Sequence, residues 1–168
     1  MRVGFVGWRG MVGSVLMDRM REEGDFEGLD ASFFSTSNPG GDGPFGAPLL
    51  DARDTGALRR VDAVVSCQGG DYTSVIHPAL RAAGWKGHWI DAASTLRMNP
   101  NATLVLDPVN EAAIRGALAA GCTDFEGPNC TVSLLLMALT PCDERAHGAK
   151  LRANGTNRAT SRPAILVE

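Results

Sequence analysis

The sequence predicts a doubly wound α/β fold, in which a parallel sheet is covered by helices on both faces. Two observations carry this prediction. Short apolar segments alternate with amphipathic segments of helical period from the first residue onward, and such alternation is typical of parallel sheets with crossover helices. A glycine-rich turn also joins the first strand-like segment to the first helical one, as is common in this class of fold.

In the first half of the chain, three apolar runs have the length of buried strands, at 2–6, 31–35 and 62–67. Two longer segments carry apolar residues at the 3.6-residue period of a helix, at 10–22 and 72–83. In the first of these, Val12, Val15 and Met20 lie on one helical face. The glycine, proline and aspartate residues of 38–48 predict a loop between the second and third strands.

The second half continues the pattern with shorter elements. Strands are expected at 88–92, 103–106 and 122–125, and helices at 110–120 and from 131 to 139. Asn110 is a suitable cap for the first of these helices, and Gly121 ends it. The class therefore remains a doubly wound, Rossmann-like sheet throughout.

The last part of the chain departs from this order. From Thr140 onward the apolar periodicity is lost, and Arg, Ala, Gly, Thr and Asn dominate. Such a composition buries too little apolar surface to offset the entropy of ordering. We therefore expect one Rossmann-like domain at 1–133, and at 134–168 the start of a helix followed by a disordered tail.

The charge distribution argues against several classes of partner. The 168 residues carry 16 basic and 19 acidic side chains, for a net charge of −3, and no basic stripe stands out before Thr140. Nothing there favours nucleic acid or a membrane surface. The longest apolar run, at 134–139, is too short to span a bilayer, and the first residues lack the features of a signal peptide. A cytoplasmic protein is expected.

The four cysteines are Cys67, Cys122, Cys130 and Cys142. Their spacing contains no C-x-x-C pair, so no zinc site is expected. So few cysteines in a chain of this length also argue against a disulfide framework. Free thiols in a reducing compartment are the better interpretation.

The turn after the first strand contains Gly7, Gly10 and Gly13. Without Cβ atoms, such a turn lets backbone amides approach a pyrophosphate, and the helix N-terminus adds partial positive charge. The spacing G-x-x-G-x-x-G is a variant of the dinucleotide-binding fingerprint, and its place between strand and helix favours phosphate binding. A tight turn that only packs the helix on the strand is the alternative.

The end of the second strand indicates which dinucleotide binds. NAD sites usually place Asp or Glu there to bind the ribose 2′-hydroxyl, but here the strand ends in Ser35, Thr36 and Ser37. Hydroxyl groups can donate to a 2′-phosphate, and Arg9 in the glycine loop can pair with it. NADP is therefore the predicted cofactor, unless 35–37 form only a polar turn.

Cys130 stands where a strand leads into a helix, directly after Asn129. The free amides and the dipole of a helix N-terminus favour the reactive thiolate, and Asn129 can cap the helix. A thiolate beside a nicotinamide site is suited to aldehyde oxidation through a thioester. The alternative is a buried, unreactive thiol, which is the interpretation favoured for the other three cysteines.

Six segments resemble those of bacterial aspartate-semialdehyde dehydrogenases, in that family's order, over about Met1 to Leu139. They are VGFVGWRGMVGSVL at 3–16, FFSTS at 33–37, SCQGGDYT at 66–73, WIDAASTLRM at 89–98, LDPVN at 106–110 and NCTVSL at 129–134. The chain thus resembles the N-terminal, NADP-binding part of these enzymes, with its cysteine nucleophile. Pro128 is a local departure, because close relatives often have glycine there.

The resemblance implies a reversible, NADP-dependent reductive dephosphorylation of aspartyl-β-phosphate to aspartate-β-semialdehyde, on the route to diaminopimelate, lysine, threonine and methionine. It implies cofactor contacts from Arg9, Gly10, Met11, Val12, Thr36, Ser37 and Gln68. It also implies that Cys130 is the nucleophile and that Arg97 binds the phosphate of the substrate, for which a forked guanidinium is suited. It implies no metal.

Members of that family are longer, and their second domain supplies a substrate-orienting glutamine, a carboxylate-binding arginine, a histidine acid–base and most of a homodimer interface. None of these has a match here, since His77 lies in a predicted helix, His88 starts a strand and His147 lies in the tail. The chain is therefore expected to be an incomplete, inactive copy, through truncation or a shifted reading frame. Two alternatives stay open: a stand-alone NADP-binding module, and an unstable remnant that exposes the apolar residues 134–137.

Overall fold

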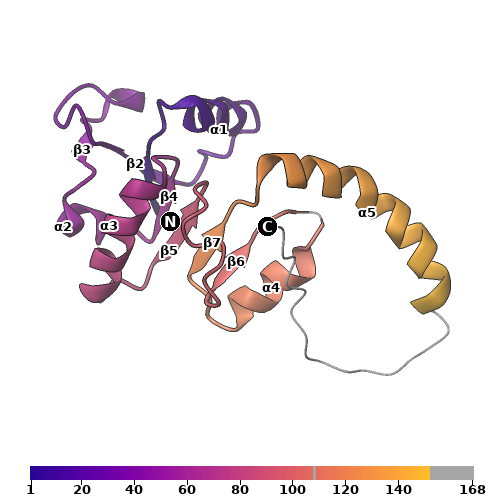
Figure 1. The fold of residues 1–168 in the computed structure, drawn as a ribbon. Coiled ribbons are helices and arrows are strands. Elements are labelled where there is room, and N and C mark those ends of the chain that lie inside the picture. Colours follow the sequence, from indigo (N-terminus) through magenta and orange to yellow (C-terminus); the bar gives the residue numbers. More distant parts are fainter. Residues whose placement is uncertain (108, 152–168) are drawn as a thin grey trace.

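The structure, a computed structural model, describes residues 1–107 and 109–151, with side chains described as far as 140. Its strands form a seven-stranded sheet in the order β3-β2-β1-β4-β5-β7-β6, and every pairing in it is parallel. They are β1 (Arg2–Val6), β2 (Asp30–Ser35), β3 (Leu50–Asp51), β4 (Ala63–Ser66), β5 (His88–Asp91), β6 (Ala102–Leu104) and β7 (Asp124–Glu126). With helices between the strands (Figure 1), this sheet confirms the predicted doubly wound α/β class.

The helices are α1 (Met11–Glu22), α2 (Thr55–Leu58), α3 (Gly70–Ala82), α4 (Glu111–Ala119) and α5 (Cys130–Leu151), with a 3-10 turn, η1, at Pro44–Gly46. Apart from the end of α5, the predicted elements agree with these bounds to within about two residues, the usual uncertainty of element ends. Three short elements were not predicted: β3, α2 and η1. They are too short to show a period in the sequence.

Two apolar clusters pack on opposite faces of the sheet. On the face covered by α2 and α3, the buried members are Val6, Phe34, Ala52, Leu58, Val61, Val64, Ile76, Leu80, Trp85 and Trp89. On the face covered by α1, they are Val3, Phe5, Met17, Phe33 and Leu49. Because successive side chains of a strand alternate between faces, neighbours such as Phe33 and Phe34 belong to different clusters. The alternation confirms that the central strands are covered on both faces.

The last helix, α5, corrects the prediction that regular structure ends near Thr140. It begins at Cys130 and continues past Leu139 to Leu151, because Ala, Glu, Arg, Lys and Leu are good helix formers even without an apolar face. The rest of the predicted tail, 152–168, lies outside the described residues. Of the apolar residues 134–137, which an unstable remnant is expected to expose, Leu134, Leu135 and Met137 are exposed, whereas Leu136 is only half-exposed. No helix in the described part is both long enough and apolar enough to cross a membrane.

Candidate active site

The loop from Gly7 to Gly10 joins β1 to α1 at the carboxyl edge of the sheet. Gly7 has a φ of +74°, and a Cβ there would lie 2.5 Å from the carbonyl carbon of Cys67 at the end of β4. A Cβ on Gly13 would lie 2.3 Å from the carbonyl oxygen of Gly7. Both contacts are too short for any side chain, so glycine at these positions lets the loop pack closely against α1 and the end of β4. The close packing is the geometry expected for a dinucleotide-binding turn.

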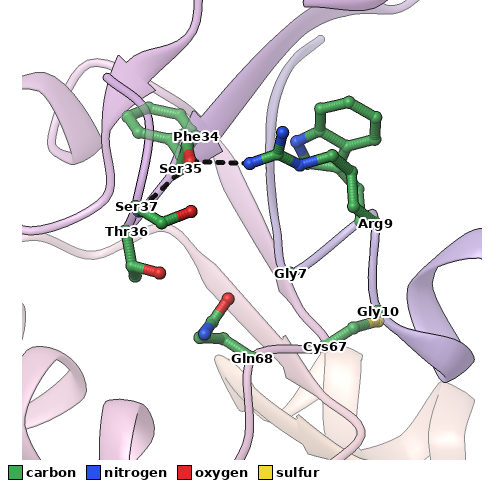
Figure 2. Close-up of a pocket in the computed structure, with 10 residues that line it drawn as sticks. Gly7, Arg9, Gly10, Phe34, Ser35, Thr36, Ser37, Cys67 and Gln68 are labelled. Atoms are coloured by element: carbon green, nitrogen blue, oxygen red, sulfur yellow. Dashed lines mark hydrogen bonds between the residues drawn. The ribbon is translucent and has the colours of Figure 1, made fainter.

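A cavity of about 310 Å³ opens at this edge, beside the loop (Figure 2). It is lined by Gly7, Trp8, Arg9, Gly10, Phe34, Ser35, Thr36, Ser37, Cys67 and Gln68. Five of the seven residues predicted to contact the cofactor are among them: Arg9, Gly10, Thr36, Ser37 and Gln68. Its lining comes from the segments that follow β1, β2 and β4, three neighbouring strands. Parallel sheets place their ligand sites at this edge.

Met11 and Val12, the other two predicted contacts, are not part of the lining. They form the first turn of α1 and are 88% and 55% exposed, respectively. Their cofactor contacts therefore stay a prediction.

Two guanidinium groups flank the hydroxyl-rich end of β2. Arg9 donates from Nη2 to Ser35 Oγ at 3.1 Å, and Figure 2 shows its side chain reaching across from the glycine loop. Arg53 donates from Nη1 to the carbonyl oxygen of Thr36 at 2.9 Å. Asp51 pairs with Ser35 in register at the edge of the sheet and accepts a hydrogen bond from the Arg53 amide. This end of the cavity is therefore rich in donors, with one carboxylate on the edge strand.

Cys130 is the first residue of α5 and is exposed. Asn129 caps the helix, because its Oδ1 accepts hydrogen bonds from the amides of Thr131 at 3.0 Å and Val132 at 3.2 Å. The predicted Asn cap is thus present. By contrast, Cys67 is partly buried in the cavity wall, where burial and then the charge of Asp91 raise the pKa of its thiol. Of these two thiols, Cys130 is the accessible one.

Arg97 ties the segment after β5 to the loop that leads into α5. Its Nε donates to the carbonyl oxygen of Gly127 at 2.8 Å, and its Nη2 lies 3.4 Å from the carbonyl oxygens of Ala92 and Pro128. The guanidinium therefore lies next to the loop that carries Cys130. Because β5 and β7 are neighbours and parallel, Arg97 and Cys130 both follow strand ends at the carboxyl edge. Neither residue lines the cavity beside the glycine loop.

Residues 2–117 match the family described as "Semialdehyde dehydrogenase, NAD binding domain". The chain belongs to this family. A solved structure of aspartate semialdehyde dehydrogenase from Francisella tularensis is 51% identical to it over 85% of the chain, with a TM-score of 0.82. The chain spans only 41% of that enzyme. It corresponds to the N-terminal part of an aspartate semialdehyde dehydrogenase, as the six sequence segments predicted.

Two more distant solved structures share the fold. Aspartate semialdehyde dehydrogenase II from Vibrio cholerae, complexed with ASA, is 22% identical over 85% of this chain and 46% of its own, with a TM-score of 0.68. The enzyme from Candida albicans, solved with NADP, is 18% identical over 86% of this chain and 47% of its own, with a TM-score of 0.58. At such identities the likeness extends to the fold alone.

The two histidines whose side chains are described, His77 and His88, lie away from Cys130. His77 lies on the buried face of α3, where its Nε2 is 3.0 Å from Asp124 Oδ1. His88 begins β5, so it lies at the amino edge of the sheet, opposite Cys130. Within the described side chains, therefore, neither histidine is hydrogen-bonded to the segment that carries Cys130.

Trp8, Arg53 and Glu126 are among the residues near the site that the sequence analysis did not assign to it. Trp8 lines the cavity, Arg53 lies beside Thr36 of its wall, and Glu126 is fully buried just before the Cys130 loop. Trp8 is the neighbour of a predicted contact, so its position was a usable signal. Arg53 follows the short strand β3, and Glu126 ends a short strand that sequence reasoning placed at 122–125. Nothing local in the sequence distinguishes either of them from an exposed charge.

Proposed function

We propose that this chain provides the NADP-binding site and the cysteine nucleophile for reductive dephosphorylation of aspartyl-β-phosphate to aspartate-β-semialdehyde. One arrangement supports the proposal above all. The exposed thiol of Cys130, bordered by Arg97, and the glycine-loop cavity all lie at the carboxyl edge of one sheet. A nucleophile, an anion-binding guanidinium and a dinucleotide site are the parts that this reaction needs. In organisms that carry it out, the reaction leads toward lysine, threonine and methionine.

The residues of the cavity fit a dinucleotide phosphate. Gly7 and Gly13 leave the space that a Cβ would fill, and Gly10 opens α1 with its unpaired first-turn amides. Gln68, at the end of β4, adds a side-chain donor and acceptor. When bound, the cofactor supplies the hydride that reduces the enzyme-bound thioester to the aldehyde.

The end of β2 favours NADP over NAD. Thr36 and Ser37 offer hydroxyl donors, and Arg9 and Arg53 hold positive charge beside them. A 2′-phosphate carries two negative charges and is stabilised by such donors. Asp51 accepts a hydrogen bond from the Arg53 amide, and it lies on β3 and not at the end of β2, where the ribose-binding acid of an NAD site usually stands.

The side chains of the thiol region act on the substrate. The Cys130 sulfur attacks the acyl carbon of aspartyl phosphate, the bond from that carbon to the phosphate oxygen breaks, and inorganic phosphate leaves. Arg97 holds the phosphate before and after this step, because its planar fork matches two oxygens of a tetrahedral oxyanion. The backbone amides at the start of α5 stabilise negative charge at the same place.

A second candidate function is a cofactor-binding module that does not turn over substrate. The absence of a described histidine near Cys130 favours it for the 168-residue chain assayed by itself. We therefore expect this chain to bind NADPH and yet give essentially no phosphate-dependent NADPH production from aspartate semialdehyde. Turnover at the rate of a full-length relative would contradict that expectation.

Cofactor binding is tested by quenching of Trp8 fluorescence, since Trp8 lines the cavity. NADPH is expected to bind more tightly than NADH, and Arg9→Ala to weaken NADPH by about tenfold or more, the loss of roughly one charge-assisted hydrogen bond. Arg60→Ala is the control, because Arg60 is exposed and lies outside the cavity lining. Equal affinity for NADH and NADPH would contradict the choice of NADP.

The nucleophile is tested with acetyl phosphate as a simple acyl donor. Intact-mass measurement is expected to show one acetyl group on the chain, removed by hydroxylamine as a thioester is, and absent in Cys130→Ser. Cys67→Ser serves as the matched control, because its thiol is partly buried. Acylation that survives in Cys130→Ser would show that another group is the nucleophile.

A further inference from the structure

Three carboxyl groups lie on one face of β5 and β7, under α3. Asp91 ends β5, and Asp124 and Glu126 are the first and last residues of β7. Asp91 and Glu126 are register partners on adjacent strands, so their side chains point to the same face. Exposure is 2% for Asp91, 8% for Asp124 and 0% for Glu126. So many buried acids in one place need compensating partners.

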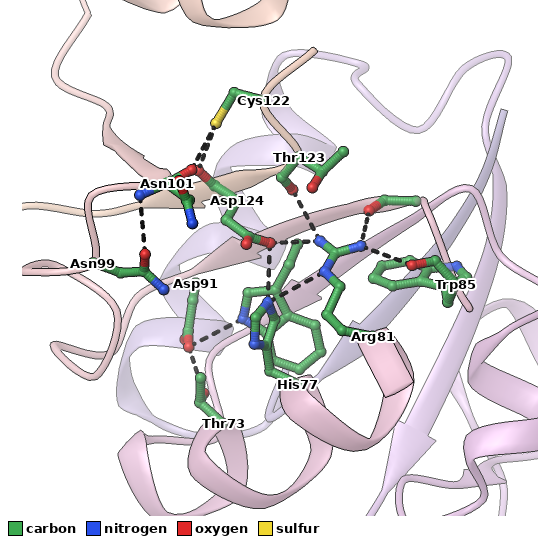
Figure 3. A network of polar contacts seen from close by, with 12 residues as sticks. Thr73, His77, Arg81, Trp85, Asp91, Asn99, Asn101, Cys122, Thr123 and Asp124 are labelled. Carbon is green, nitrogen blue, oxygen red and sulfur yellow. Dashed lines mark hydrogen bonds and ion pairs between the residues drawn. The ribbon is translucent and has the colours of Figure 1, made fainter. Parts of the chain in front are cut away.

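Asp124 has such partners. Its Oδ1 accepts a hydrogen bond from Arg81 Nη2 at 2.5 Å and lies 3.0 Å from His77 Nε2 (Figure 3). Burial opposes the ionisation of Asp124, but these two hydrogen bonds outweigh it, and the pKa of Asp124 is lowered. Asp124 therefore remains an ionised and fully compensated carboxylate.

Asp91 is compensated as well. Its Oδ2 accepts hydrogen bonds from the hydroxyl of Thr73 and from Trp89 Nε1 at 3.3 Å, and its Oδ1 accepts one from the amide of Ala93 at 2.9 Å. Both oxygens of this buried carboxyl therefore have hydrogen-bond donors.

Glu126 differs from both. Neither of its carboxyl oxygens has a hydrogen-bond partner in the described part of the chain, although the backbone of Leu96 approaches it. Burial, followed by the charge of Asp91, raises the pKa of Glu126 to about 8, and Asp124 acts in the same direction. The charge of Arg97 lowers it, and the backbone of Leu96 lowers it less strongly, so the guanidinium lies close enough to interact with this carboxyl.

Arg97 is not neutralised by any other acid among the described side chains. Its hydrogen bonds go to the carbonyl oxygens of Ala92, Gly127 and Pro128, which leave its positive charge intact. Gly127, which accepts from Arg97 Nε, directly follows Glu126. The protonation state of Glu126 therefore decides how much net positive charge the region around Arg97 carries.

We propose that Glu126 is a positioning residue held as the neutral acid beside Asp91, so that the charge of Arg97 stays available for a phosphate-like anion next to Cys130. This inference rests on the proposed phosphate-binding role of Arg97. When Glu126 loses its proton, it forms an ion pair with Arg97 and repels the incoming anion. Anion affinity at this site then falls as pH rises, and a bound anion in turn holds the proton on Glu126 more tightly, as linkage requires.

Sulfate is the probe, because its charge stays constant over the pH range in which phosphate itself titrates. Binding is followed through the ¹³Cζ resonance of Arg97, assigned with Arg97→Met, so that anions at the glycine loop do not contribute. In the wild-type chain, sulfate is expected to bind about tenfold more weakly at pH 9 than at pH 7. Glu126→Gln is expected to remove this pH dependence. Glu111→Gln, at an exposed carboxylate paired with Arg115, is the matched control and is expected to keep it.

The protonation of Glu126 is measured directly in the wild-type chain, so the test does not depend on the folding of a variant. With ¹³C-labelled glutamate, one carboxyl carbon is expected to titrate near pH 8, absent in Glu126→Gln, and its midpoint is expected to rise when sulfate is added. In Arg97→Met, that midpoint is expected to stay high and to lose its response to sulfate.

The outcomes separate the two proposals. If sulfate binds at Arg97 with the same affinity at both pH values, the inference about Glu126 is overturned while the role of Arg97 stands. The same follows if Glu126 titrates like an ordinary exposed carboxyl. If sulfate at neutral pH does not perturb Arg97 at all, the phosphate-binding role of Arg97 falls, and the inference about Glu126 falls with it.

Discussion

On the face of the sheet that α1 covers, one row of side chains crosses neighbouring strands in register. It runs through Phe33, Phe5, Val65, Ile90 and Phe125. Over β3, β2, β1 and β4, here called the nucleotide half, Phe33 and Phe5 are each 1% exposed. Over β5, β7 and β6, the thiol half, Ile90 is 41% exposed, whereas Phe125 beside it is 6% exposed. The cover that α1 gives to the nucleotide half does not extend over Ile90.

The opposite face shows a second difference between the halves. Its row runs through Phe34, Val6, Ser66, Asp91 and Glu126, all of them buried. The row changes from apolar to polar at Ser66, at the boundary of the halves. Apolar burial does not change with pH, whereas buried carboxyl groups make stability depend on pH when their pKa differs between the folded and unfolded states. The comparison shows one continuous sheet with an apolar row beside the glycine loop and buried acidic groups beside the thiol.

The largest expected effect is a loss of stability, and it compares a buried and an exposed residue of the same row. Phe33→Ala is expected to lower the free energy of unfolding by about 3 to 5 kcal/mol, because it removes a fully buried ring from the core. That ring stacks on Phe5, with centroids 5.4 Å apart. Ile90→Ala, in the same row, is expected to cost much less. Urea unfolding of the two variants measures the difference, and equal losses would contradict the weaker burial of Ile90.

The next prediction tests the buried polar network of the thiol half. Asp124→Ala is expected to lower the free energy of unfolding by about 3 kcal/mol at neutral pH, because His77 and Arg81 lose their buried partner. Because the pKa of Asp124 is lowered in the folded state, its stabilisation is present above the ordinary carboxyl pKa and is lost as pH falls through the lowered value. Acid titration of the unfolding free energy should therefore be shallower in the variant. An unchanged acid slope would contradict the role of this network.

A gain of stability is expected at Glu126. Its raised pKa of about 8, against an ordinary 4.5, means that the folded state resists ionisation that the unfolded state accepts. Stability is therefore full below about pH 4.5 and falls as pH rises toward 8. Glu126→Gln is expected to be more stable than wild type by about 2 kcal/mol above pH 8, with a much smaller difference in acid. Denaturant unfolding across this pH range gives the result, and a constant difference at all pH values would exclude a titrating carboxyl.

The smallest expected effect lies at the start of α5. Asn129→Ala is expected to cost about 1 kcal/mol, since two helix amides lose their side-chain acceptor. Asn129→Asp keeps the acceptor and should restore the stability. Thermal unfolding of both variants compares them, and identical melting of the Ala and Asp variants would mean that the cap contributes nothing.

Much of the fold and of the cofactor site could be predicted because the signals are local. The glycines at 7, 10 and 13 and the period of α1 are visible in the sequence, and each has a steric or packing cause within a few residues. The cap at Asn129 is equally local. The end of α5 could not be placed in this way, because helix propensity continues past the last apolar residue. The short elements β3 and α2 could not be predicted either, because the conformation of such short segments depends on contacts with neighbouring parts of the chain.

The sequence by itself determined the fold class, the order of the elements and the positions of Arg9, Arg97 and Cys130 along the chain. The tertiary structure decided which of these residues share a site. Arg53 lies beside Thr36, and Glu126 lies beside Asp91, only because parallel pairing brings separate strand ends together. Burial and the charge of a neighbour, which set the protonation of Glu126, are properties of that packing. No pattern within one segment of the chain encodes them.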